Sequence, residues 1–196
     1  MPAVNKLTLF ALACILFAGS ASAQPIHDPV GDFIPSYVGP PNPDLDVVNG
    51  VVIFTGNGFL FQATMDGDIG DYSETLGRYV WGVDRGRGAE TANFAQLGLP
   101  NIIFDCVVAV RPGDNSVVND IFFDRVTPLP AENIVVLDRT ITVWVPLSLL
   151  PSPPSGVPPG EYTWNLWPRW DGIPMSDEQI SDFAPDDHNA SVVVVR

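Results

Sequence analysis

The fold is decided by a stretch of strict alternation, Phe59-Leu-Phe-Gln-Ala-Thr-Met65. Successive side chains of a β-strand point to opposite faces, so the aromatic and aliphatic residues at every second position fall together on one face. A second stretch, residues 140–147, alternates in the same way, with Ile141, Val143, Val145 and Leu147 on one side. Both runs therefore predict strands whose apolar faces form the core.

Short apolar runs bounded by Gly, Pro, Asn and Asp recur along the rest of the chain, which is typical of strands joined by turns. The expected strands are Val47–Thr55, Phe59–Met65, Arg78–Val83, Ile102–Val110, Val117–Phe123, Ile134–Leu137, Thr140–Leu147, Tyr162–Trp167 and Ser191–Val195. Residues 25–43 are rich in Pro and Gly, which favours an extended entry strand or an ordered loop over a helix. The sequence predicts an all-β antiparallel sandwich of about nine strands, immunoglobulin-like or jelly-roll.

The first 23 residues read as a signal peptide, followed by a single β-sandwich domain over residues 24–196. Lys6 precedes an apolar run from Leu7 to Ala18, which is too short to span a membrane, and Ala21-Ser-Ala23 fits a cleavage site. We therefore expect a secreted protein, periplasmic or extracellular, with no membrane span after cleavage. It keeps one cysteine, Cys106, which alternation groups with residues 102, 104, 108 and 110 as a buried small hydrophobe.

The 196-residue chain carries 23 acidic and 9 basic residues, for a net charge of −14. Such an excess of negative charge makes nucleic acid and anionic membrane surfaces poor partners. The sequence contains no HExxH, GxSxG or phosphate-binding glycine loop, and no catalytic residue is assigned.

Aspartates near both ends of the domain are the strongest candidates for a metal site. Calcium prefers six to eight oxygen ligands, which closely spaced Asp residues around Gly and Pro turns can supply. The candidate ligands are Asp28, Asp32, Asp44, Asp46, Asp182 and Asp186. If the first and last strands are neighbours, the group around Asp182 meets the Asp28 and Asp32 segment at one end of the domain. The alternative is that these residues only cap turns.

Exposed aromatic residues suggest a carbohydrate surface, because flat rings stack on sugar faces while polar neighbours bind hydroxyls. Alternation along residues 162–170 places Trp164 in the core and Trp167 outward, beside Asn165 and Arg169. Trp144 faces outward on its own strand and is the second candidate. The alternative to sugar binding is that either tryptophan has only a packing role and covers a sheet or a loop.

Several short motifs together resemble the DOMON-like and family 9 carbohydrate-binding β-sandwiches of secreted bacterial proteins. They are Asp28-Pro-Val-Gly-Asp32, Pro43-Asp44-Leu45-Asp46, Tyr79-Val-Trp-Gly-Val-Asp84-Arg-Gly86, Val145-Pro146-Leu147 and Gly160-Glu-Tyr-Thr-Trp164. The resemblance implies a sandwich that binds a sugar or another small ligand and often holds structural calcium.

The sequence therefore favours a secreted, non-enzymatic binding module with calcium and an extracellular glycan as its expected ligands. Two other hypotheses remain open. The protein is either a glycosidase-like hydrolase that uses two carboxylates, or a structural protein of the extracellular matrix or cell surface. A binding module needs a flat aromatic strip, an enzyme needs a cleft with a buried acid, and a matrix protein needs an unpaired edge strand.

The leader itself yields a first prediction: the exported protein begins at Gln24. Small residues at positions 21 and 23 fit the signal peptidase site, so cleavage after Ala23 is expected. Intact-mass analysis of protein exported by the native host tests this, and a retained leader would contradict it.

Overall fold

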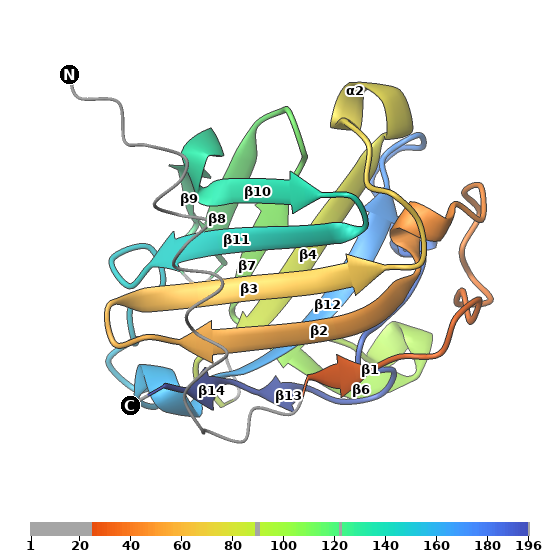
Figure 1. Cartoon of the computed structure of the whole chain (residues 1–196). Coiled ribbons are helices and arrows are strands. Elements are labelled where there is room, and N and C mark those ends of the chain that lie inside the picture. Colours follow the sequence, from red (N-terminus) through yellow and green to blue (C-terminus); the bar gives the residue numbers. More distant parts are fainter. Residues whose placement is uncertain (1–24, 89–90, 122, 196) are drawn as a thin grey trace, which may run out of the picture.

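The computed structural model describes residues 25–88, 91–121 and 123–195. The signal peptide predicted for residues 1–23 and its cleavage site lie outside these residues. Within them, two six-stranded sheets pack face to face as a β-sandwich, which confirms the predicted fold class (Figure 1). No helix in this part of the chain is both long and apolar enough to cross a membrane.

The first sheet has the order β1-β2-β3-β11-β10, with β14 added in parallel beside β2. All its other pairings are antiparallel. The strands are β1 (Ile26–His27), β2 (Val47–Phe54), β3 (Gly58–Met65), β10 (Ile134–Leu137), β11 (Thr140–Pro146) and β14 (Val193–Val194).

The second sheet has the order β13-β12-β4-β7-β8-β9 and is antiparallel. Its strands are β4 (Gly77–Asp84), β7 (Cys106–Val110), β8 (Ser116–Asp120), β9 (Arg125–Leu129), β12 (Thr163–Trp170) and β13 (Ala190–Ser191). A separate hairpin is formed by β5 (Ala92–Phe94) and β6 (Leu99–Phe104). One short α-helix, α2 (Tyr72–Thr75), and 3-10 turns at 43–45, 95–97, 131–133, 159–161 and 177–179 complete the described elements.

The core between the two sheets is the one that alternation predicts. Phe59, Phe61, Ala63 and Met65 are buried, as are Ile141, Val143 and Val145, while Leu147, just beyond β11, is half-buried against the same core. These residues of the first sheet pack against Trp81, Trp164 and other inward residues of the second. The period-2 pattern was therefore sufficient to identify the inner face of the first sheet.

The predicted strand at 102–110 is in fact two strands, because Asp105 interrupts it. Cys106 is buried as predicted, and it faces the main core with Val108 and Val110. The prediction that Ile102 and Phe104 share this face is wrong, since both lie in a second apolar cluster. The Asp105 carboxylate accepts hydrogen bonds from the backbone and the side chain of buried Arg85, which explains why the chain turns here.

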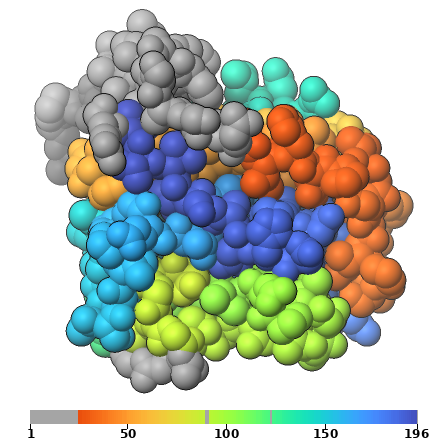
Figure 2. Space-filling view, turned by 90° about the horizontal axis from the view of Figure 1, so that it is seen from below, coloured from red at the N-terminus to blue at the C-terminus, as the bar shows by residue number. Residues whose placement is uncertain are grey.

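This second apolar cluster covers the outer face of β4 and β12. It consists of Val80, Phe94, Ile102, Phe104, Trp167, Ile180 and Phe183, with Ile34 and the β5–β6 hairpin packed against it. Figure 2 shows the C-terminal residues, in blue, lying between the orange N-terminal segment and the green residues of the hairpin region. Both faces of β4 and β12 are therefore buried.

The prediction that Trp167 is exposed is wrong. Trp167 does lie on the face opposite Trp164, but it is only 2% exposed because Phe94 and Phe104 pack against its ring, with centroids 5.0 and 4.8 Å away. The ring also lies over Gly82, where any Cβ would overlap it. Trp167 is a packing residue of the second cluster.

Truncation of Trp167 is expected to destabilise the protein. Trp167→Ala should lower the free energy of unfolding by roughly 3–5 kcal/mol, the usual cost of deleting a buried aromatic side chain. Half-buried Trp144 provides the control, because Trp144→Ala removes less buried surface and should cost clearly less. Denaturant unfolding of the two variants and the wild type measures this, and equal stability of Trp167→Ala and wild type would contradict it.

Candidate metal centre

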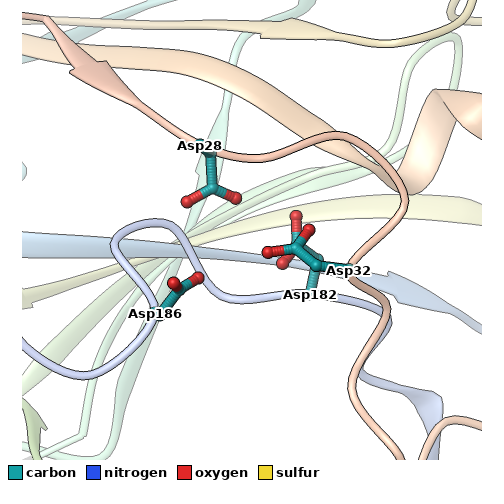
Figure 3. A group of neighbouring side chains, drawn as sticks. All are labelled: Asp28, Asp32, Asp182 and Asp186. Carbon is teal, nitrogen blue, oxygen red and sulfur yellow. The ribbon is translucent and has the colours of Figure 1, made fainter.

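Four aspartates gather where the two ends of the domain meet. Asp28 and Asp32 follow β1, and Asp182 and Asp186 belong to the loop between β12 and β13. Each contributes a carboxylate oxygen to a group in which all the oxygens lie within 4.8 Å of one another. The side chains converge on one space from two separate loops (Figure 3). The structure thus brings together four of the six predicted metal ligands.

Backbone pairing positions the N-terminal segment, residues 25–42. Ile26 pairs with Gly50 in the β1–β2 ladder, and the Asp28 backbone N–H donates to the Val48 carbonyl at 3.0 Å. Further along, the Ile34 N–H donates to the carbonyl of Ser181 at 2.9 Å. This last bond links the N-terminal segment directly to the loop that carries Asp182 and Asp186.

Asn165 holds that loop against the second sheet. It is completely buried, and its Nδ2 donates to the Pro185 carbonyl at 2.6 Å and to the His188 carbonyl at 2.9 Å. Ala184 and Leu166 also exchange two backbone hydrogen bonds, at 2.8 and 2.9 Å. The sequence placed Asn165 at a sugar-binding surface, whereas the structure makes it a support for the acidic loop.

Asp182 is the buried member of the group, with 2% exposure. Its two oxygens accept hydrogen bonds from the backbone N–H groups of Val47, at 2.9 Å, and Phe183, at 2.7 Å. These bonds favour the charged carboxylate, but burial and the charges of Asp32 and Asp46 outweigh them and raise the pKa of Asp182 to about 7.

Asp28 is more strongly perturbed. Burial, followed by the nearby charges of Asp182, Asp186 and Asp32, raises the pKa of Asp28 to about 9. Its Oδ2 is buried without a hydrogen-bond partner among the described residues. Burial, then Asp32 and Asp187, also raises the pKa of the more exposed Asp186. A cation between these carboxylates would offset both causes of the raised pKa values, the burial of the charges and their mutual repulsion.

Asp46 lies beside the group but is not one of its four members. It is 3% exposed, and its Oδ2 accepts a 2.7 Å hydrogen bond from the Gly31 N–H, which fixes the turn between Asp28 and Asp32. Its Oδ1 is buried without a hydrogen-bond partner among the described residues. Asp46 therefore positions the loop that carries two of the candidate ligands.

Asp44 also falls outside the group, because the 3-10 turn Pro43–Leu45 directs it to a different part of the interior. Its backbone carbonyl accepts a 3.0 Å hydrogen bond from the Tyr79 hydroxyl, and its side chain is buried. Burial raises the pKa of the Asp44 carboxyl. The two aspartates of the motif Pro43-Asp-Leu-Asp46 thus lie in different environments: Asp44 in the interior and Asp46 beside the four-aspartate group.

The four predicted sugar-binding residues do not form one aromatic surface. Trp167, Asn165 and Arg169 lie on the covered face of the second sheet, and the Arg169 guanidinium donates to the Ser176 carbonyl at 2.5 Å. Trp144 lies on the first sheet, half-buried, with its ring beside Gly58. The prediction that Trp167, Asn165 and Arg169 form a solvent-exposed platform is therefore wrong.

The chain matches no model of a known protein family, and no curated protein is significantly similar to it. The chemistry of the four aspartates is therefore the main indication of function.

The raised pKa values predict how stability depends on pH without metal. The folded state holds protons on Asp28 and Asp182 that the unfolded chain releases near pH 4, so stability should fall as pH rises from about 4 through 7 to 9. Asp28→Asn should make this fall smaller, because a neutral amide replaces the protonated carboxyl. The measurement is the melting temperature between pH 5 and pH 8 in a chelator.

Asp187→Asn is the matched control, since Asp187 neighbours Asp186 but its side chain is 77% exposed and lies outside the group. This variant should keep most of the wild-type pH dependence, because Asp187 perturbs Asp186 but is not among the causes of the raised pKa of Asp28 or Asp182. A melting temperature that rises with pH in the chelator, or an equal effect of both variants, would contradict the interpretation.

Proposed function

We propose that this chain is an exported, non-enzymatic β-sandwich protein that binds one calcium ion between its N-terminal segment and its C-terminal loop. The observation that carries the proposal is the convergence of Asp28, Asp32, Asp182 and Asp186 within 4.8 Å. Like charges gathered in this way, and partly removed from water, destabilise the fold unless protons or a cation neutralise them.

The donor set favours calcium over softer metals. Four carboxylates offer only oxygen, and the group contains no imidazole or thiolate of the kind that zinc and copper prefer. Calcium accepts six to eight oxygens in irregular geometry, so water and backbone carbonyls can supply the remainder. Magnesium demands a near-ideal octahedron and fits two converging loops less well.

The proposed role of the ion is to fasten the two chain ends together. Asp28 and Asp32 are separated from Asp182 and Asp186 by most of the chain, and few backbone hydrogen bonds join the two loops. A ligand that binds only the native state stabilises it by RT ln(1 + [L]/Kd), about 2.7 kcal/mol when the ligand is at a hundredfold excess over Kd. Calcium would therefore act as a structural cross-link.

Export is the second part of the proposal, and the signal-peptide pattern of residues 1–23 supports it. Calcium sites of extracellular modules commonly have dissociation constants of roughly 0.1–1 mM, which suits a site open at one side. The proposal keeps two properties that the resemblance to DOMON-like and family 9 carbohydrate-binding modules implies. They are the β-sandwich fold and a structural calcium ion. We do not include glycan binding in the proposal, because Trp167, the main candidate for stacking on a sugar, is buried.

Calcium is expected to raise the melting temperature of the wild-type protein by several degrees at saturation, at roughly 2–4 °C per kcal/mol. Asp186→Asn and Asp32→Asn should each reduce this response, because each removes one charged ligand. Differential scanning calorimetry with calcium, magnesium or chelator measures it. Limited proteolysis should show faster cleavage within residues 25–42 when the chelator is present.

Asp187→Asn is again the matched control, since it removes the same charge from the same loop and should keep the full calcium response. An identical melting temperature in calcium and chelator would leave the aspartates without a metal. A calcium response that all three variants retain would place the ion elsewhere.

A further inference from the structure

Three arginines gather at the ends of β4, β7 and β12, which is unusual in a chain with only 9 basic residues and a net charge of −14. They are Arg78 on β4, Arg169 on β12 and Arg111 after β7. Arg78 and Arg169 are direct partners in the antiparallel β4–β12 ladder. Like charges directly opposite one another destabilise a sheet, so this pair requires compensation.

One carboxylate serves two of these three arginines. Asp171 contacts Arg78 at 2.8 Å and Arg111 at 3.2 Å, and it also accepts a 3.1 Å hydrogen bond from the Tyr72 hydroxyl. Arg169 has no carboxylate within 4.0 Å among the described residues. Burial and then the charge of Arg78 lower the pKa of Arg169 to about 10. Positive charge at the Arg78 and Arg169 pair is thus only partly neutralised.

Three hydrogen-bond donors at this place are buried without a partner among the described residues: Arg78 Nε, Arg169 Nε and Ser176 Oγ. Arg78 is only 7% exposed. The bond from Arg169 Nη2 to the Ser176 carbonyl, at 2.5 Å, brings Ser176 against the Arg169 guanidinium. Buried polar groups, and charged donors above all, are normally satisfied, so these donors indicate a missing acceptor.

We propose that Arg78, Arg169 and Ser176 form a binding site for a small oxyanion, such as a sulfate-like or carboxylate group. Such a ligand supplies several acceptor oxygens with negative charge, which matches two guanidinium groups and one hydroxyl. Arg169 is half-buried, and the covering loop carries Met175 at 78% exposure, so the pair lies directly below the surface. The site binds the opposite charge from the aspartate group and shares none of its residues.

The test uses the purified chain in calcium chloride, to which sodium sulfate, sodium acetate or sodium chloride is added at equal ionic strength. Sulfate probes a tetrahedral oxyanion, acetate a planar one, and chloride serves as the reference. We expect saturable one-to-one binding of sulfate or acetate by calorimetry, and a higher melting temperature than in chloride. Binding of sulfate but not acetate would indicate a site for a tetrahedral anion, and binding of acetate but not sulfate a site for a planar one.

Arg169→Gln should weaken that binding by roughly tenfold or more, because a charge-assisted donor is lost. Ser176→Ala lies in the covering loop and changes only one hydroxyl, so it tests the site even if Arg169→Gln folds poorly, and it should weaken binding by a smaller factor. Arg139→Gln, which removes the same charge at an exposed position, is the control and should bind like wild type.

Oxyanions that stabilise wild type no more than chloride would overturn the proposal. Equal weakening by Arg139→Gln would also overturn it, because the effect would then reflect net charge and not this site.

Discussion

Burial of the second sheet on both faces is the constraint on which the rest of the structure depends. All but the last residue of β4 are buried, and β12 is buried from residue 164 to 168. The inner face packs against the first sheet, while the outer face would leave Trp167 and Val80 in water if nothing covered it. Apolar surface of this size must be removed from solvent, so other segments have to lie across it.

The covering segments are the β5–β6 hairpin and the two ends of the domain. Phe183 of the C-terminal loop packs on Trp167, and Ile34 of the N-terminal segment packs against the same cluster. Because both chain ends are drawn over one sheet, their loops meet, and with them Asp28, Asp32, Asp182 and Asp186. The acidic group is therefore a consequence of how the outer face is covered, and a cation there would strengthen the same cover.

Buried charge in this protein is compensated in two different ways. Arg85 is fully buried, but its guanidinium contacts two carboxylates, Asp105 and Asp120, the second at 3.1 Å. Arg169 lacks a carboxylate at such a distance among the described residues, and the four aspartates lack a cation among themselves. A buried charge with its counter-charge in the chain is a structural element, whereas converging charges of one sign point to a ligand from outside.

The sequence by itself determined the inner core, because strict alternation at residues 59–65 and 140–147 has one interpretation in a strand. It also placed acidic motifs near the first and last strands, but the meeting of Asp28 with Asp182 followed only on the assumption that these strands are neighbours. The outer face was not predictable in this way. Asn165, Trp167 and Arg169 mix polar and aromatic residues, and that pattern fits a solvent-exposed platform as well as a covered face. Only the tertiary structure decided between them, because the cover comes from hairpin and loop residues far away in the sequence. The same holds for Asp44, which a local 3-10 turn directs into the interior, while Asp46, two residues later, fixes the turn between Asp28 and Asp32.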